Sequence, residues 1–183
     1  MGQYYKAIIL AEKPQATGGK EIIRLWSFPH DYGYGTTLME HSYFDNHFVL
    51  NVEYQLSPEG MFYLSRVVWA GDYADDEPLQ EGEDDSANLY ELCEKDDTHM
   101  PLPHHDTKDY PYLVNHTTKQ YVDKEKEDIH PLPLLTVEGN GRGNGDYGGH
   151  NEELCGTWAR HVLSIEKEPP AGYEELLCAF EEY

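Results

Sequence analysis

Carboxylates give this sequence its strongest chemical signal. The stretch DYADDEPLQEGEDDSANLYELCEKDD, residues 72–97, holds 12 acidic residues and one lysine, so its net charge of −11 is half of the chain's −22. Because crowded carboxylates repel one another, the stretch is either a solvated loop or a surface that meets a positively charged partner. Tyrosines among acids also imitate the charge and flat apolar surface of nucleic acid. We predict a partner-binding surface formed by Asp72, Tyr73, Asp75, Asp76, Glu77, Glu81, Glu83, Asp84, Asp85, Tyr90 and Glu91.

A glycine-rich segment, EGNGRGNGDYGGH at residues 138–150, contains six glycines and one cation, Arg142. Glycine permits positive φ, so successive backbone N–H groups could cradle a phosphate that Arg142 pairs with. The segment lacks the Lys-Ser/Thr ending of a P-loop, however, and Glu138 and Asp146 would repel an anion. A flexible connecting loop is the favoured interpretation, and capture of a phosphorylated small ligand is the alternative. If the loop contacts a protein partner, Arg142 is its natural anchor.

Histidine and aspartate stand together at His30-Asp31, a pair that resembles the HD pair of metal-dependent phosphohydrolases. Zinc spacing such as CxxC or HExxH is absent from the chain. Solvated histidines and a turn at residues 30–35 are the favoured interpretation, so we predict no metal and no cofactor. A metal-dependent hydrolase remains a third alternative, with further potential ligands at His99, His104, His105 and Asp106.

Nucleophilic side chains lack the patterns that would activate them. No serine stands in a GxSxG motif. Three cysteines, Cys93, Cys155 and Cys178, form an odd set without CxxC spacing, which argues against a disulfide framework and fits a reducing compartment. We therefore predict a protein that is not an enzyme.

Composition narrows the class of partner. A hydrophobic fraction of 39% is too high for a wholly disordered acidic chain. A net charge of −22 opposes direct binding to nucleic-acid phosphates or anionic lipid. The N-terminus resembles no signal peptide and no apolar run approaches the length of a membrane span, so we expect a soluble, cytoplasmic protein.

The first half, residues 1–99, is predicted to fold as β-β-α-β. Residues 4–10 and 21–28 are rich in β-branched and aromatic residues and read as two strands, and residues 61–73 as a third. Apolar residues every four positions after a capping-box pattern at Thr37 predict a helix over about residues 37–56. In the acidic stretch, Leu89, Leu92 and Cys93 have helical spacing, so a short helix would hold the carboxylates on its other faces.

The second half, residues 112–183, follows a proline-rich linker at residues 100–111. We predict a hairpin around Asn115, a strand at residues 132–138, the glycine-rich loop, a strand at residues 157–166 and a terminal helix over residues 173–183. Strands and helices do not alternate regularly. The sequence therefore predicts an α+β fold with a largely antiparallel sheet.

Four stretches, MGQYYK, LMEHSYFDNHFV, VVWAGDYAD and LLTVEGNGRGNGDY, resemble a set of small acidic proteins of bacteriophages and gut bacteria. Their size, acidity and lack of an enzymatic motif are similar to phage anti-CRISPR proteins that inhibit Cas9. That resemblance implies a DNA mimic in the host cytoplasm that occupies a basic, nucleic-acid-binding surface, and Cas9 is the expected partner. It assigns no role to any individual residue and leaves the oligomeric state open.

Overall fold

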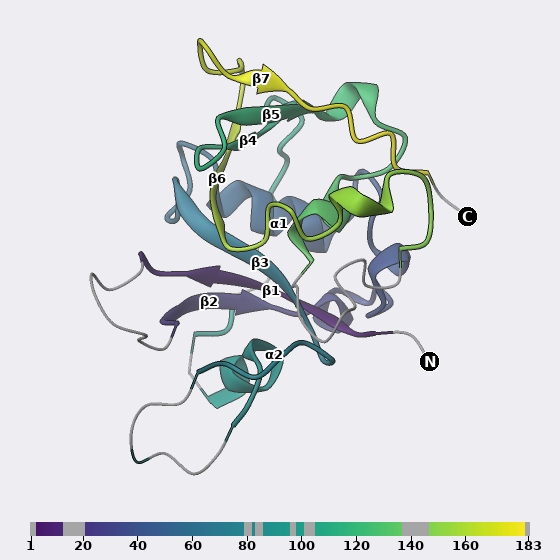
Figure 1. Ribbon diagram of the computed structural model, residues 1–183. Coiled ribbons are helices and arrows are strands. Elements are labelled where there is room, and N and C mark those ends of the chain that lie inside the picture. Colours follow the sequence, from purple (N-terminus) through teal and green to yellow (C-terminus); the bar gives the residue numbers. More distant parts are fainter. Residues whose placement is uncertain are drawn as a thin grey trace.

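One seven-stranded sheet organises the protein in the computed structural model, which describes residues 3–12, 21–78, 82, 86–95, 98–100, 105–136 and 147–181 (Figure 1). The strand order is β2-β1-β3-β6-β4-β5-β7, and every neighbouring pair is antiparallel except β5 with β7. The predicted α+β class with a largely antiparallel sheet is confirmed. The elements are β1 (Tyr5–Leu10), β2 (Ile23–Ser27), α1 (His47–Gln55), β3 (Ser65–Gly71), α2 (Leu89–Leu92), β4 (Tyr112–Asn115), β5 (Gln120–Asp123), β6 (His161–Glu166) and β7 (Glu174–Glu175), with short 3-10 turns between them.

Strand β1 is buried along its whole length because the sheet is covered on both faces there. Its alternate residues Tyr5, Ala7 and Ile9 enter the large core, which also takes the apolar face of α1. Ile8 and Leu10 enter a smaller core that includes two residues from α2 and the turn after it. Figure 1 shows α1 and α2 on opposite sides of these strands. The predicted β-β-α-β order of the first half is confirmed.

The two halves of the chain share this sheet. Strand β3 from the first half pairs with β6 from the second, with Ser65 opposite Leu163 and Val67 opposite His161. The predicted hairpin around Asn115 is confirmed as β4 and β5. In the predicted linker, residues 101–104 lie outside the described residues, while Thr107 and Tyr110 are buried.

Helix α1 begins about ten residues later than predicted. The capping box at Thr37 and Glu40 does form, but it starts only a 3-10 turn, Leu38–Glu40. Asp45 then adopts a φ of 65°, which a helix cannot continue through. The helix proper starts after Asn46, whose side chain accepts hydrogen bonds from the backbone N–H groups of Phe48 and Val49.

Two predicted strands are shorter than expected for a similar reason. Leu64 has a φ of 59° and Arg160 a φ of 64°, both in the left-handed region that ends extended backbone. Strand β3 therefore begins at Ser65 and β6 at His161.

The strand predicted at residues 132–138 is wrong for its described part. Leu132–Leu135 form a 3-10 turn, and Thr136 makes an isolated bridge to Trp69. Pro131 and Pro133 lack backbone N–H groups and have fixed φ values, so this segment suits a turn better than a strand. Residues 137 and 138 lie outside the described residues.

The predicted terminal helix is also wrong. Residues 174–181 contain no helix: Glu174–Glu175 form β7, which pairs in parallel with β5, and Ala179 has a left-handed φ of 48°. Cys178 and Phe180 are buried while Leu177 is 62% exposed, an alternation of period two that overrides the helical spacing. Glu127 completes the arrangement by accepting hydrogen bonds from the backbone N–H groups of Cys178 and Ala179.

Candidate functional site

Helix α2 fixes the described part of the acidic stretch to the sheet. Asn88 caps the helix by accepting a hydrogen bond from the backbone N–H of Glu91. Leu89 and Cys93 are buried in the smaller core against Val68, and Glu91 is exposed. The predicted short helix with carboxylates on its outer face is confirmed for these residues.

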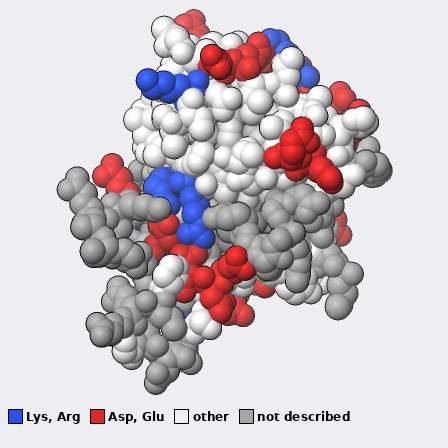
Figure 2. All heavy atoms as spheres, viewed as in Figure 1, with Lys and Arg blue, Asp and Glu red and all other residues white. Residues whose placement is uncertain are grey.

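The exposed part of the predicted surface consists of Tyr73, Asp75, Asp76 and Glu91. On the face shown in Figure 2, carboxylates gather in the lower half, where Figure 1 places α2, and again along the upper rim. Of the other predicted partner-binding residues, Glu81, Glu83, Asp84, Asp85 and Arg142 lie outside the described residues.

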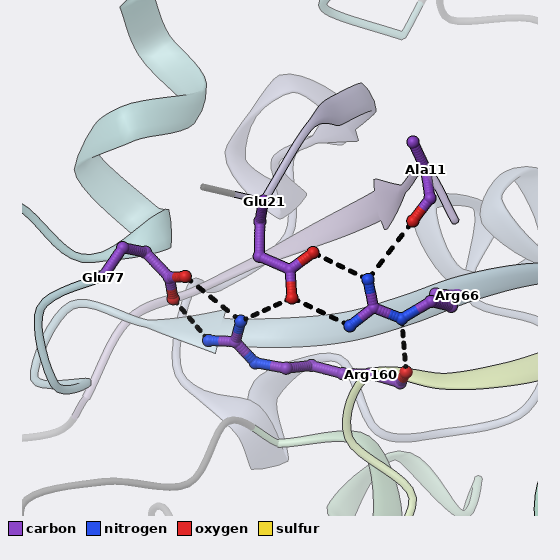
Figure 3. A network of polar contacts seen from close by, with 5 residues as sticks. All are labelled: Ala11, Glu21, Arg66, Glu77 and Arg160. Atoms are coloured by element: carbon purple, nitrogen blue, oxygen red, sulfur yellow. Dashed lines mark hydrogen bonds and ion pairs between the residues drawn. The ribbon is translucent and has the colours of Figure 1, made fainter. Parts of the chain in front are cut away.

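Glu77 is buried, whereas the neighbouring Asp75 and Asp76 are exposed. It is 7% exposed and binds Arg160 Nη2 through Oε1 at 2.5 Å. Arg160 also binds Glu21, whose two oxygens receive Nη1 and Nη2 of Arg66 at 2.7 and 2.8 Å (Figure 3). Burial raises the pKa of Glu21, but the hydrogen bonds and positive charges of Arg66 and Arg160 together outweigh it and keep that pKa below its ordinary value. Glu77 therefore belongs to an internal ion-pair network and is not among the exposed carboxylates that could contact a partner.

Tyr90 and Asp72 also have internal partners. The ammonium group of Lys6, almost fully buried, lies 3.7 Å from the centre of the Tyr90 ring and donates to the Tyr90 carbonyl at 2.9 Å. Glu94 neutralises this ammonium group at 2.5 Å. Burial raises the pKa of Tyr90 to about 12, with Asp72 and Glu94 adding to the effect. Asp72 accepts a hydrogen bond from the backbone N–H of Tyr4.

The metal-ligand candidates do not converge. Asp31 Oδ2 binds His99 Nε2 at 2.7 Å, whereas the exposed His30 lies against the Phe28 ring. His105 stacks on Tyr54 with ring centres 3.6 Å apart. Asp106 accepts a hydrogen bond from the backbone N–H of Lys108, and His104 is outside the described residues. Within the described part of the chain, no group of three or more His, Cys, Asp or Glu side chains is arranged to hold a metal ion.

A serine and a histidine that the sequence did not connect lie together on the sheet. His116 Nε2 is 2.8 Å from Ser164 Oγ, and the Ser164 hydroxyl donates to Glu166 at 2.6 Å. Ser164 is fully buried, and its Oγ lies within hydrogen-bonding distance of both the imidazole and the carboxylate. Burial lowers the pKa of His116, so it is neutral and Tyr173 completes its hydrogen bonding. These side chains form a hydrogen-bond network on the sheet in which the serine is fully buried.

A second feature missed by the sequence analysis is a cavity of about 420 Å³ beside α1, here named the α1 cavity. Glu53 lies at its wall, 4% exposed, and accepts hydrogen bonds from Lys124 and His130 at 2.7 Å and from Thr107 at 3.0 Å. Burial favours the neutral acid, but Lys124 and His130 outweigh it and lower the pKa of Glu53 to about 2. A glutamate within the apolar stripe of α1 was the available signal, because a buried acid needs partners.

Comparisons with known proteins returned no relative. No family model, no curated protein and no solved structure matches this chain.

Proposed function

We propose that the protein is a non-enzymatic inhibitor that binds a positively charged surface of a nucleic-acid-handling defence protein. The observation that carries the proposal is the anchoring of α2, because Leu89 and Cys93 are buried against the sheet while Glu91 faces solvent. A carboxylate on a fixed helix loses less conformational entropy on binding than one on a loose loop.

Charge supports the same proposal at longer range. A net charge of −22 raises the association rate with a basic partner, and exposed Asp76 and Glu91 add contacts once the partner has docked. Exposed Tyr73 supplies an aromatic side chain of the type that contributes strongly to interfaces. Cas9 is the partner to test first, by the resemblance to anti-CRISPR proteins.

The test compares two variants that each remove three exposed negative charges. One carries Asp75→Asn, Asp76→Asn and Glu91→Gln on the acidic stretch. The other, a matched control, carries Glu152→Gln, Glu153→Gln and Glu168→Gln, all exposed and outside that stretch. Glu77 is left unchanged because its loss would disrupt the Arg160 network.

Affinity for purified Cas9 is measured over a range of salt concentrations, together with Cas9 binding to DNA. We expect the unaltered protein to bind with a steep loss of affinity as salt rises, because screening weakens interactions between exposed charges. The first variant should bind more weakly and with a smaller salt dependence than the control. Equal affinities for the two variants would remove the acidic stretch from the interface, and no binding to Cas9 by any form would reject Cas9 as the partner.

A further inference from the structure

Apolar and polar side chains both line the α1 cavity. The apolar lining comes from Phe44, Val49, Leu50, Tyr110 and Pro111. A volume of about 420 Å³ is within the range of pockets that hold small organic molecules. A ligand body of about the size of a substituted benzene ring would bury apolar surface here.

The buried charges of this cavity already compensate one another. Glu53 is paired with Lys124, and His130 donates its Nε2 proton to the same carboxylate. Glu127, another lining residue, receives two backbone N–H groups from Cys178 and Ala179. None of these groups is available to a ligand without the loss of an existing partner.

The exposed charges leave an excess of negative charge. Lys108, the second lysine of the described lining, stands 3.7 Å from Asp45, so that pair has little net charge. Glu125 is exposed, and its carboxylate has no ion-pair partner among the described residues. The Glu125 carboxylate would therefore repel an anionic ligand and attract a cationic one.

Two residues of the lining, Asn46 and His130, each have one buried side-chain nitrogen without a hydrogen-bond partner in the described structure. Asn46 caps α1 through Oδ1, and its Nδ2 is buried without a hydrogen-bond partner in the described structure. His130 Nδ1 is buried without a partner as well. Because Nε2–H of His130 donates to Glu53, Nδ1 carries the lone pair of the neutral ring and can accept. Both atoms are closed to solvent, so the proposed ligand contacts do not include them.

We propose that the α1 cavity binds a small organic amine, with its apolar or aromatic body on Phe44, Val49 and Leu50 and its ammonium group at Glu125. Among the described residues, none of the acidic stretch lines this cavity, so the amine site is separate from the proposed inhibitor surface. The cavity adjoins a smaller one of about 190 Å³ that shares Asp45 and Leu50 and adds Asp106, a further carboxylate. A longer or doubly charged amine would reach into this extension.

The experiment is calorimetry with phenethylamine and with 3-phenylpropionate, two probes with the same phenyl body and opposite charge. We expect saturable binding of phenethylamine and none of 3-phenylpropionate. Glu125→Gln should weaken binding of the amine about threefold, the magnitude of one exposed ion pair. Glu152→Gln, which removes an exposed charge outside the cavity, should leave the affinity unchanged.

A second variant tests the position of the site. Leu50→Trp places an indole in the cavity and should abolish binding, with thermal unfolding used to establish that the variant is folded. The proposal is overturned if phenethylamine does not bind, if 3-phenylpropionate binds equally well, or if Glu125→Gln and Glu152→Gln have the same affinity.

Discussion

Glu53 joins α1 to residues 107–130 by accepting hydrogen bonds from Thr107, Lys124 and His130. Its carboxylate is buried and compensates the equally buried Lys124 at 2.7 Å. Replacement of Glu53 by Gln leaves the ammonium group without its counter-charge, so we expect a loss of about 3–5 kcal/mol in the free energy of unfolding. Urea denaturation measures it.

The control for this prediction is Glu125→Gln, an exposed charge on the same cavity, which should change stability by less than about 0.5 kcal/mol. Adding Lys124→Met to Glu53→Gln should restore part of the lost stability, because it removes the uncompensated charge. The interpretation fails if Glu53→Gln and Glu125→Gln unfold at the same urea concentration.

His41 should make stability depend on pH. It is fully buried, accepts a hydrogen bond from Trp69 Nε1 at 3.1 Å, and burial lowers its pKa from 6.5 to about 4. Between these two values the unfolded chain binds a proton that the folded protein excludes. The free energy of unfolding is therefore unaffected by this protonation above pH 6.5. It decreases as the pH falls toward 4, by about 3 kcal/mol in total.

The measurement is the free energy of unfolding against pH for the unaltered protein and for His41→Gln, which keeps an acceptor for Trp69 but does not titrate. The pKa values of His116 and His130 are also lowered, and both residues are present in the two proteins, so the difference between the curves isolates His41. Parallel curves between pH 6.5 and 4 would contradict the assignment.

In the C-terminal segment, tertiary contacts decide the secondary structure. A helix would bury both Leu177 and Phe180, whereas the observed non-helical segment buries Phe180 completely and leaves Leu177 62% exposed. Phe180→Ala should thus cost about 3–5 kcal/mol of stability, as expected for an emptied core position. Leu177→Ala should cost less than about 0.5 kcal/mol. Chemical denaturation of the two variants provides the comparison, and equal losses would favour the helix.

At the scale of the whole molecule, a net charge of −22 on 183 residues makes the folded state repel itself. Added sodium chloride should raise the melting temperature, because screening reduces this repulsion over distances near 10 Å. The variant with Asp75→Asn, Asp76→Asn and Glu91→Gln should melt at the same or a higher temperature in low salt and gain less from salt. A melting temperature that falls with added salt would show that ion pairs outweigh the repulsion.

Much of the fold is determined by local sequence patterns. Strands β1 and β2, the β4–β5 hairpin and the buried face of α2 were all predicted, because alternation, turn residues and helical spacing act between residues a few positions apart. The exposure of Asp75, Asp76 and Glu91 also follows from their charge, since isolated carboxylates are costly to bury.

Only the tertiary structure decided which charged side chains are buried. It also decided the secondary structure of segments whose apolar spacing fits both a helix and a strand. Arg160 pairs with the buried Glu77 and the part-buried Glu21 from 83 and 139 residues away, and the buried Glu53 pairs with His130, 77 residues further along the chain. The segment around Phe180 has both helical and alternating apolar spacing. Pairing of Glu174–Glu175 with β5 and the hydrogen bonds from Cys178 and Ala179 to Glu127 favour the alternating one. Such choices depend on partners that a local pattern does not contain, so the acidic surface was visible in the sequence and the α1 cavity was not.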